Sequence, residues 1–152
     1  MTDASFADAD EAPLRLRALD VEDLRVVSAL LQDAVGPAGD MAFLKRQRRF
    51  AALLNRFRWE GQARTPERVR SMLVVENAVA VRSQGLPLGD KDLVLSVLNL
   101  AWEGDPDGPG RLVLTLAGDG LVAVEADALE VLLQDVTKPY RAPSRRAPSH
   151  PD

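Results

Sequence analysis

The segment RLVLTLAGDGLVAVEA, residues 111–126, decides the fold class, because two apolar runs flank a short turn sequence. Leu and Val dominate both runs, which is typical of strands that bury one or both faces. Between the runs stands Gly118-Asp119-Gly120, and an Asp-Gly pair favours the type I′ turn that joins antiparallel strands. The segment therefore predicts a β-hairpin, and with it a largely antiparallel sheet.

Further runs of the same kind precede this hairpin. The segments SMLVVENAVAVR (71–82) and LVLSVLNLAW (93–102) are rich in Val and Leu, and they are separated by the turn-forming segment SQGLPLGDKD. The segment LRLRAL (14–19) alternates apolar and charged residues, as a half-buried strand does. With RRFAALLNRFRWE (48–60), these runs predict about seven or eight strands in a bent sheet or partial barrel.

Two helices are predicted beside the sheet. Asp20, followed by Asp23, is typical of the N-cap of a short helix. Asp127, with Glu130 three residues later, predicts a second helix at the C-terminal end, where Leu129, Leu132, Leu133 and Val136 would form an apolar stripe. The sequence thus predicts a single α+β domain, which resembles a pleckstrin-homology-like barrel by analogy.

Residues 28–35, SALLQDAV, fit two interpretations. A longer first helix would place Leu24, Val27 and Leu31 on one face. A strand over 29–35 would instead end at GPAGD and form a hairpin with MAFL. We favour the strand, because Gly36, Pro37 and Gly39 suit such a turn.

The two ends of the chain differ from its middle. Residues 1–12 are acidic with little to bury, and residues 138–152 hold four of the ten prolines. Both segments are predicted to be disordered tails around one domain at 13–137. The acidic start is unlike a secretory signal, and no apolar run approaches the roughly 18 residues of a membrane span. We therefore expect a cytoplasmic protein without membrane insertion.

Several blocks of the chain resemble one bacterial family. The blocks ALDVEDLRVVSALLQDAV, RRFAALLNRFRWE, VRSQG and VLSVLNLAWE are similar, in this order, to the family called domain of unknown function 2948. The resemblance covers about residues 14–136. The family has no assigned activity, ligand or catalytic residue, so the resemblance implies no function for any position of this chain.

Few residues offer catalytic or metal-binding chemistry. The chain has no Cys, and its one histidine, His150, lies in the predicted tail, so the sequence favours neither a Ser-His-Asp site nor a His or Cys metal site. Glu103, Asp105 and Asp107 belong to EGDPDG, where Pro and Gly favour turns over a Ca²⁺ loop. We expect no cofactor, no metal and no catalytic residue.

A basic window is the one candidate surface. Residues 45–70 hold nine Lys or Arg against Glu60 and Glu67, a charge of +7, and the remainder carries ten bases against 21 acids, a charge of −11. Strand alternation in NRFRWE predicts Arg56 and Arg58 on a solvent face, joined by Arg46 and Arg48. Phe57 and Trp59 would then be core residues, and Asn55 a buried amide with its hydrogen bonds satisfied.

Three functional classes remain. We expect most a non-catalytic protein-binding or assembly module with a protein partner. The alternative is a weak binder of RNA or a phosphate ligand through Arg46, Arg48, Arg56 and Arg58, and an enzyme is the third. The oligomeric state stays undetermined, and Arg-rich composition by itself accounts for the basic window equally well.

Overall fold

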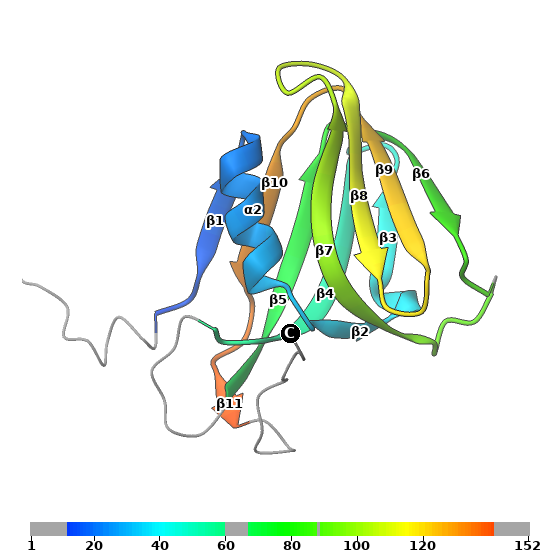
Figure 1. Cartoon of the computed structure of the whole chain (residues 1–152). Coiled ribbons are helices and arrows are strands. Elements are labelled where there is room, and N and C mark those ends of the chain that lie inside the picture. Colours follow the sequence, from blue (N-terminus) through cyan, green and yellow to red (C-terminus); the bar gives the residue numbers. More distant parts are fainter. Residues whose placement is uncertain (1–11, 60–66, 88, 142–152) are drawn as a thin grey trace, which may run out of the picture.

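The computed structural model describes residues 12–59, 67–87 and 89–141 (Figure 1). Over these residues it is an 11-stranded antiparallel sheet with one α-helix and a single turn of 3-10 helix. The elements in chain order are β1 (Arg15–Ala18), α2 (Val21–Leu30), β2 (Val35–Pro37), η1 (Ala38–Asp40), β3 (Met41–Leu44), β4 (Arg49–Phe57), β5 (Glu67–Glu76), β6 (Ala78–Gln84), β7 (Val94–Gly104), β8 (Gly110–Leu116), β9 (Leu121–Ala126), β10 (Val131–Asp135) and β11 (Tyr140–Arg141).

The strands lie in the order β1-β10-β5-β4-β2-β7-β8-β9-β6, with β3 added to β4 and β11 added to β5. The short strand β2 links the two halves, because Val35 pairs with Asn55 on β4 and with Ser96 on β7. The sheet bends there, so the half made by β7, β8, β9 and β6 lies over β4 and β3 (Figure 1). Side chains of both halves, such as Leu54 and Leu112, share one buried core.

The hairpin predicted from residues 111–126 is confirmed. Strands β8 and β9 pair from Gly110 and Ala126 to Thr115 and Leu121. At the turn, Gly118 and Asp119 both have positive φ, 84° and 69°, as the two central residues of a type I′ turn require. The local sequence thus set this turn.

The helix α2 is longer than predicted. Its N-cap is Asp20, whose carboxylate accepts a hydrogen bond from the Asp23 N–H at 2.8 Å. The favoured strand over 29–35 is wrong, because Ala29 and Leu30 continue the helix and only Val35 belongs to a strand. The alternative, a longer helix with one apolar face, is confirmed, because Leu24, Val27 and Leu31 are all buried. Burial of such a stripe stabilises a helix more than local propensity does.

The predicted C-terminal helix is also wrong, because residues 131–135 form the strand β10. Leu129, Val131 and Leu133 point into the core with a period of two, whereas Val136 of the predicted stripe is half exposed. Strand β10 pairs with β1 on one side and β5 on the other. Backbone bonds to two neighbouring strands therefore outweigh an N-cap signal that the local sequence also carries.

The sheet extends past residue 137, the predicted end of the domain. The strand β11, Tyr140–Arg141, pairs with Arg68 and Glu67 on β5, so this part of the predicted C-terminal tail belongs to the sheet. Residues 1–11 and 142–152 lie outside the described residues. Within the described part, no helix is long and apolar enough to cross a membrane.

Candidate functional site

The structure does not gather the four predicted arginines on one surface. Arg46 is exposed in the turn between β3 and β4. Arg48 is exposed beside it and forms an ion pair with Asp127. Arg56 and Arg58 are buried, with 0% and 8% of their surface exposed. The predicted anion-binding face of Arg46, Arg48, Arg56 and Arg58 is therefore not formed.

The reason lies in the alternation of β4. Phe50, Ala52, Leu54 and Arg56 face the core, so Arg56 shares the inward parity of three apolar residues. The opposite parity, Leu53 and Asn55, faces outward and is only partly buried. The assignment of Asn55 to the core side was wrong, since "AALL" is apolar in both phases and does not reveal which phase is inside.

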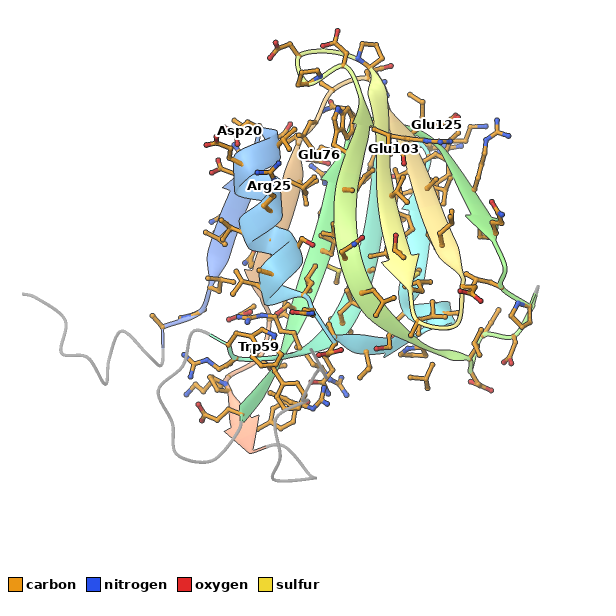
Figure 2. All side chains as sticks on the ribbon, in the orientation of Figure 1. Asp20, Arg25, Trp59, Glu76, Glu103 and Glu125 are labelled. Atoms are coloured by element: carbon orange, nitrogen blue, oxygen red, sulfur yellow. The ribbon has the colours of Figure 1, made fainter. Side chains whose placement is uncertain are left out.

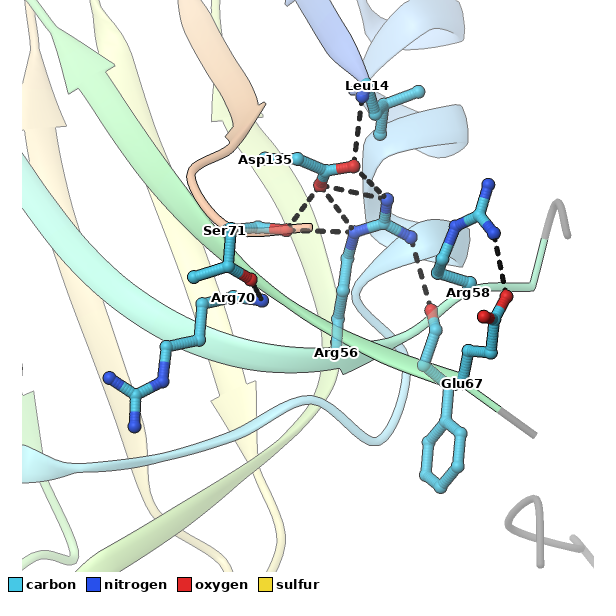
Figure 3. A network of polar contacts seen from close by, with 9 residues as sticks. Leu14, Arg56, Arg58, Glu67, Arg70, Ser71 and Asp135 are labelled. Carbon is cyan, nitrogen blue, oxygen red and sulfur yellow. Dashed lines mark hydrogen bonds and ion pairs between the residues drawn. The ribbon is translucent and has the colours of Figure 1, made fainter. Parts of the chain in front are cut away.

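Arg56 lies at the centre of a buried polar network (Figure 3). Its Nη2 atom donates to both carboxylate oxygens of Asp135, at 3.0 and 3.1 Å, and its Nε atom donates to the Ser71 hydroxyl oxygen at 2.9 Å. Nη1 donates to the Phe57 carbonyl oxygen at 3.1 Å. The guanidinium group is thus used inside the fold, as a buried charge requires.

Asp135 connects this network to the start of the chain. Its carboxylate accepts hydrogen bonds from the Ser71 hydroxyl at 2.7 Å and from the Leu14 N–H at 2.9 Å. The Asp135 N–H in turn donates to the Leu14 carbonyl oxygen at 2.9 Å. The network therefore joins β4, β5 and β10 to the residue before β1, which is a structural role.

The residues after Arg56 no longer alternate between the two faces of the sheet, because β4 ends at Phe57. Phe57 is 3% exposed, so its predicted core position is confirmed, whereas Trp59 is 39% exposed and the prediction for it is wrong. Trp59 lies near the end of α2 (Figure 2), and its Nε1 atom donates to the Gln32 carbonyl oxygen at 3.2 Å. Its ring contacts that of Phe57 at 5.7 Å between centroids.

Three further side chains surround this strand end. Arg58 donates from Nη1 to the Glu67 carboxylate at 2.9 Å. The Arg68 guanidinium lies 3.9 Å from the centre of the Phe57 ring, a cation–π arrangement, and burial lowers the pKa of Arg68. The buried Oδ1 atom of Asn55 has no hydrogen-bond partner among the described residues, so the prediction of a satisfied amide is wrong.

A more promising surface is the solvent-facing side of β1, β10, β5, β4 and β3, which we call the outer face. Its strand register places aliphatic residues side by side: Leu132 opposite Val74, Val74 opposite Ala51, and Met72 opposite Leu53. All five are partly buried, and none belongs to the core cluster or packs against it. The outer face thus has an aliphatic centre that the described part of the chain leaves accessible.

Charged residues surround this centre. The basic members are Arg15 and Arg17 on β1, Arg49 on β4 and Arg70 on β5, and the acidic members are Glu76 and Glu130. Arg17 pairs with Glu130 at 3.6 Å and Arg49 with Glu76. The hydrogen bond to Glu76 raises the pKa of Arg49. Arg70 points away from the buried network (Figure 3) and borders a depression of about 220 Å³ that also contains Leu53 and Asn55.

A second concave site lies between β3 and β6. It is an apolar pocket of about 330 Å³, and its walls include Phe43, Phe50, Val81, Leu93 and Val122. Ser83, Asp90 and Lys91 are its exposed polar members. Its volume is at the lower end of the range for ligand-binding pockets.

Catalytic and metal-binding groups are sparse in the described ranges, where no cluster of three or more His, Cys, Asp or Glu residues is placed to hold a metal ion. In EGDPDG, the Asp105 carboxylate accepts the Asp107 N–H at 2.9 Å, and the Trp102 ring N–H donates to the Asp105 carbonyl oxygen at 2.8 Å. These bonds are those of a turn. His150 lies outside the described residues.

The chain belongs to the family described as "Protein of unknown function (DUF2948)", whose model matches residues 14–150. The resemblance noted in the sequence is thereby confirmed, over a somewhat longer range. No curated protein and no solved structure matches the chain. The geometry of the outer face and of the pocket is therefore the basis for any functional proposal.

Proposed function

We propose that this protein is a non-catalytic protein-binding module that docks a partner on its outer face. The observation that carries the proposal is the run of aliphatic residues in register across β10, β5 and β4, on the side of the sheet that faces solvent. An antiparallel sheet with one solvated face normally places polar residues there. A contiguous apolar centre on that face is typical of an interaction surface.

The composition of the outer face fits a protein interface in particular. Such interfaces combine an apolar centre that contains few charges with a polar rim, and Met and Arg are enriched in them. Met72 lies in the aliphatic centre, and Arg15, Arg17, Arg49 and Arg70 lie at the rim. The partner's apolar side chains would cover Met72 and its neighbours while its polar groups contact the arginines.

The charges of the rim indicate an acidic partner. Four arginines stand against Glu76 and Glu130, so the rim carries +2 (4 − 2) although the whole chain carries −4. Arg15 and Arg70 pair with no carboxylate in the described ranges. A second copy of this face would bring like charges together at the rim, which disfavours a symmetric dimer through it.

The same observations weigh against RNA, the alternative considered from the sequence. Recognition of single strands relies on aromatic side chains on which bases stack. The centre of the outer face is aliphatic, and Phe57 at the end of β4 is buried beneath Arg68. Arg56 and Arg58 are buried in internal contacts. An RNA or phosphate ligand would therefore depend on rim arginines alone.

The bend at β2 supports a partial barrel, but β10 occupies the place of the helix on which the pleckstrin-homology-like analogy depends. The bacterial cytoplasm remains the proposed location. We propose no enzymatic activity, because the carboxylates of the outer face that could act as general bases, Glu76 and Glu130, form ion pairs with Arg49 and Arg17.

The test uses a photo-crosslinking amino acid at Met72, in the centre of the outer face, in the protein expressed in its own cells. The matched control carries the same amino acid at Leu98, which is 43% exposed on β7 in the other half of the sheet. We expect a discrete crosslinked protein from position 72 and none from position 98. The captured protein is then purified, and its affinity for the unmodified chain is measured.

Charge reversal of Arg15 and Arg70 together to Glu should weaken the measured affinity by about tenfold or more, because the rim would lose its complementarity to an acidic partner. A variant that folds normally and binds the purified partner as tightly as the wild type would contradict the proposal. Crosslinking of position 72 to RNA instead of protein would support the alternative.

A further inference from the structure

The bent sheet has an open seam between β6 and β3. Strand β6 is the last in the sheet order and pairs only with β9, and β3 pairs only with β4. At one end the seam is closed, because the Ala78 N–H donates to the Arg48 carbonyl oxygen at 2.9 Å. Beyond that bond, no backbone hydrogen bond within the described residues joins β6 to β3 or β4.

The apolar pocket of about 330 Å³ lies in this seam, with Phe43 of β3 on one side and Val81 and Ser83 of β6 on the other. An unpaired strand edge exposes N–H and C=O groups that are free to pair with another chain. Free backbone groups and an apolar pocket therefore lie beside the same strand. The combination is the one that β-strand addition uses, in which backbone bonds supply affinity and pockets supply specificity.

We propose that β6 binds an extended segment of a partner protein as an added strand, with apolar side chains of that segment in the seam pocket. A small apolar molecule would fill the pocket without using the free backbone edge. An extended segment satisfies both. This site lies on β6 and its pocket, neither of which belongs to the aliphatic centre of the outer face, so it is a second interaction site that does not depend on the first.

The register of β6 indicates the sequence of the bound segment. Val81 and Ser83 pair with Val124 and Val122, whose side chains are in the core, so both face inward. Arg82 between them faces outward and is largely exposed, 3.6 Å from Glu125 in an ion pair. Because an added strand alternates in the same way, its residues opposite Val81 and Ser83 would be apolar and the residue between them would be polar or acidic, toward Arg82.

The site is tested with synthetic peptides acetyl-Lys-Thr-Φ-Glu-Φ-Thr-Lys-amide, in which Φ is Leu, Ile, Val, Met or Phe at both positions. Binding to the full-length chain is measured by isothermal titration calorimetry, and amide chemical shifts are followed by NMR. We expect saturable binding of at least one peptide of this set, with shifts that concentrate on residues 79–84. A peptide with Ser at both Φ positions should not bind.

Two variants distinguish the loss of this site from a general effect of a large added side chain on peptide binding. Ser83→Trp fills the seam pocket from an exposed position and should weaken binding by about tenfold or more, because the apolar side chains of the peptide lose their place. Gln84→Trp places the same side chain on the next residue, which faces away from the pocket, and should leave binding within about twofold of the wild type, because the pocket and the backbone edge are both kept.

Methylation of the peptide backbone nitrogens separates strand addition from simple filling of the pocket. A bound peptide whose affinity is unchanged by this methylation would show that only the pocket is used, and strand addition would be wrong. Failure of every peptide in the set to bind the wild type would equally overturn the proposal. Neither result would affect the outer face, whose test does not involve β6.

Discussion

Arg56 and Asp135 form a buried ion pair across β5, although they are 79 residues apart in the sequence. Their side chains are 0% and 2% exposed. Asp135 stands opposite Ser71 on β5, and Arg56 reaches it past the Ser71 hydroxyl. The small side chain between them allows this contact, and the hydroxyl bonds to both partners.

Replacement of Arg56 by Met should lower the free energy of unfolding by about 3–5 kcal/mol, because Asp135 would remain buried without its countercharge. The double variant Arg56→Met, Asp135→Leu should lose less than the sum of the two single variants, since neither charge is then left alone. Urea denaturation of all four proteins measures this. Additive losses would contradict a coupled pair, and a loss below about 0.5 kcal/mol for Arg56→Met would restore a surface role for Arg56.

Ser71→Ala should cost about 1 kcal/mol, because the change removes a hydroxyl that both donates to Asp135 and accepts from Arg56. The matched control is Ser83→Ala on β6, where the serine is exposed, and it should change stability by less than about 0.5 kcal/mol. Thermal denaturation of the two variants compares them. Equal effects would show that the Ser71 hydroxyl adds nothing to the network.

Phe57→Ala should destabilise the fold by about 3–5 kcal/mol, as the loss of a buried aromatic does, and should also remove the ring beneath Arg68. Trp59→Ala should cost less, about 1–2 kcal/mol, because the indole is 39% exposed and loses mainly its hydrogen bond to Gln32 and its contact with Phe57. Chemical denaturation tests the ranking. The opposite order would mean that Trp59 is a core residue after all.

Gly36→Ala should destabilise the fold by about 1–3 kcal/mol, since an added Cβ would lie 2.8 Å from the Leu53 carbonyl oxygen, a backbone atom that has little freedom to move. Gly36 is on β2, which links the two halves of the sheet. The control is Gly118→Asn, at a position with open space and a φ of 84° that Asn tolerates better than most residues. If Gly36→Ala were as stable as the wild type, the close packing of β2 on β4 would be wrong.

The local sequence was sufficient to predict a turn or a helix start wherever neighbouring residues alone determine its geometry. The Gly118-Asp119 turn places its two flanking runs in antiparallel pairing whatever else the chain does. The Asp20 cap begins α2 in the same way, because its carboxylate bonds to an N–H only three residues away. A largely antiparallel, sheet-rich α+β domain and family membership were therefore evident from residues 14–136 before any tertiary information.

Only the tertiary structure decided which face of each strand is inside. Residues 127–136 carry both an N-cap signal and a period of two, and the adjacent edges of β1 and β5 selected the strand. Arg56 appeared to belong outside because a charged residue is rarely fully buried without a partner, and its partner Asp135 is 79 residues away. Burial of a charge depends on a partner brought by the fold, which local periodicity does not contain.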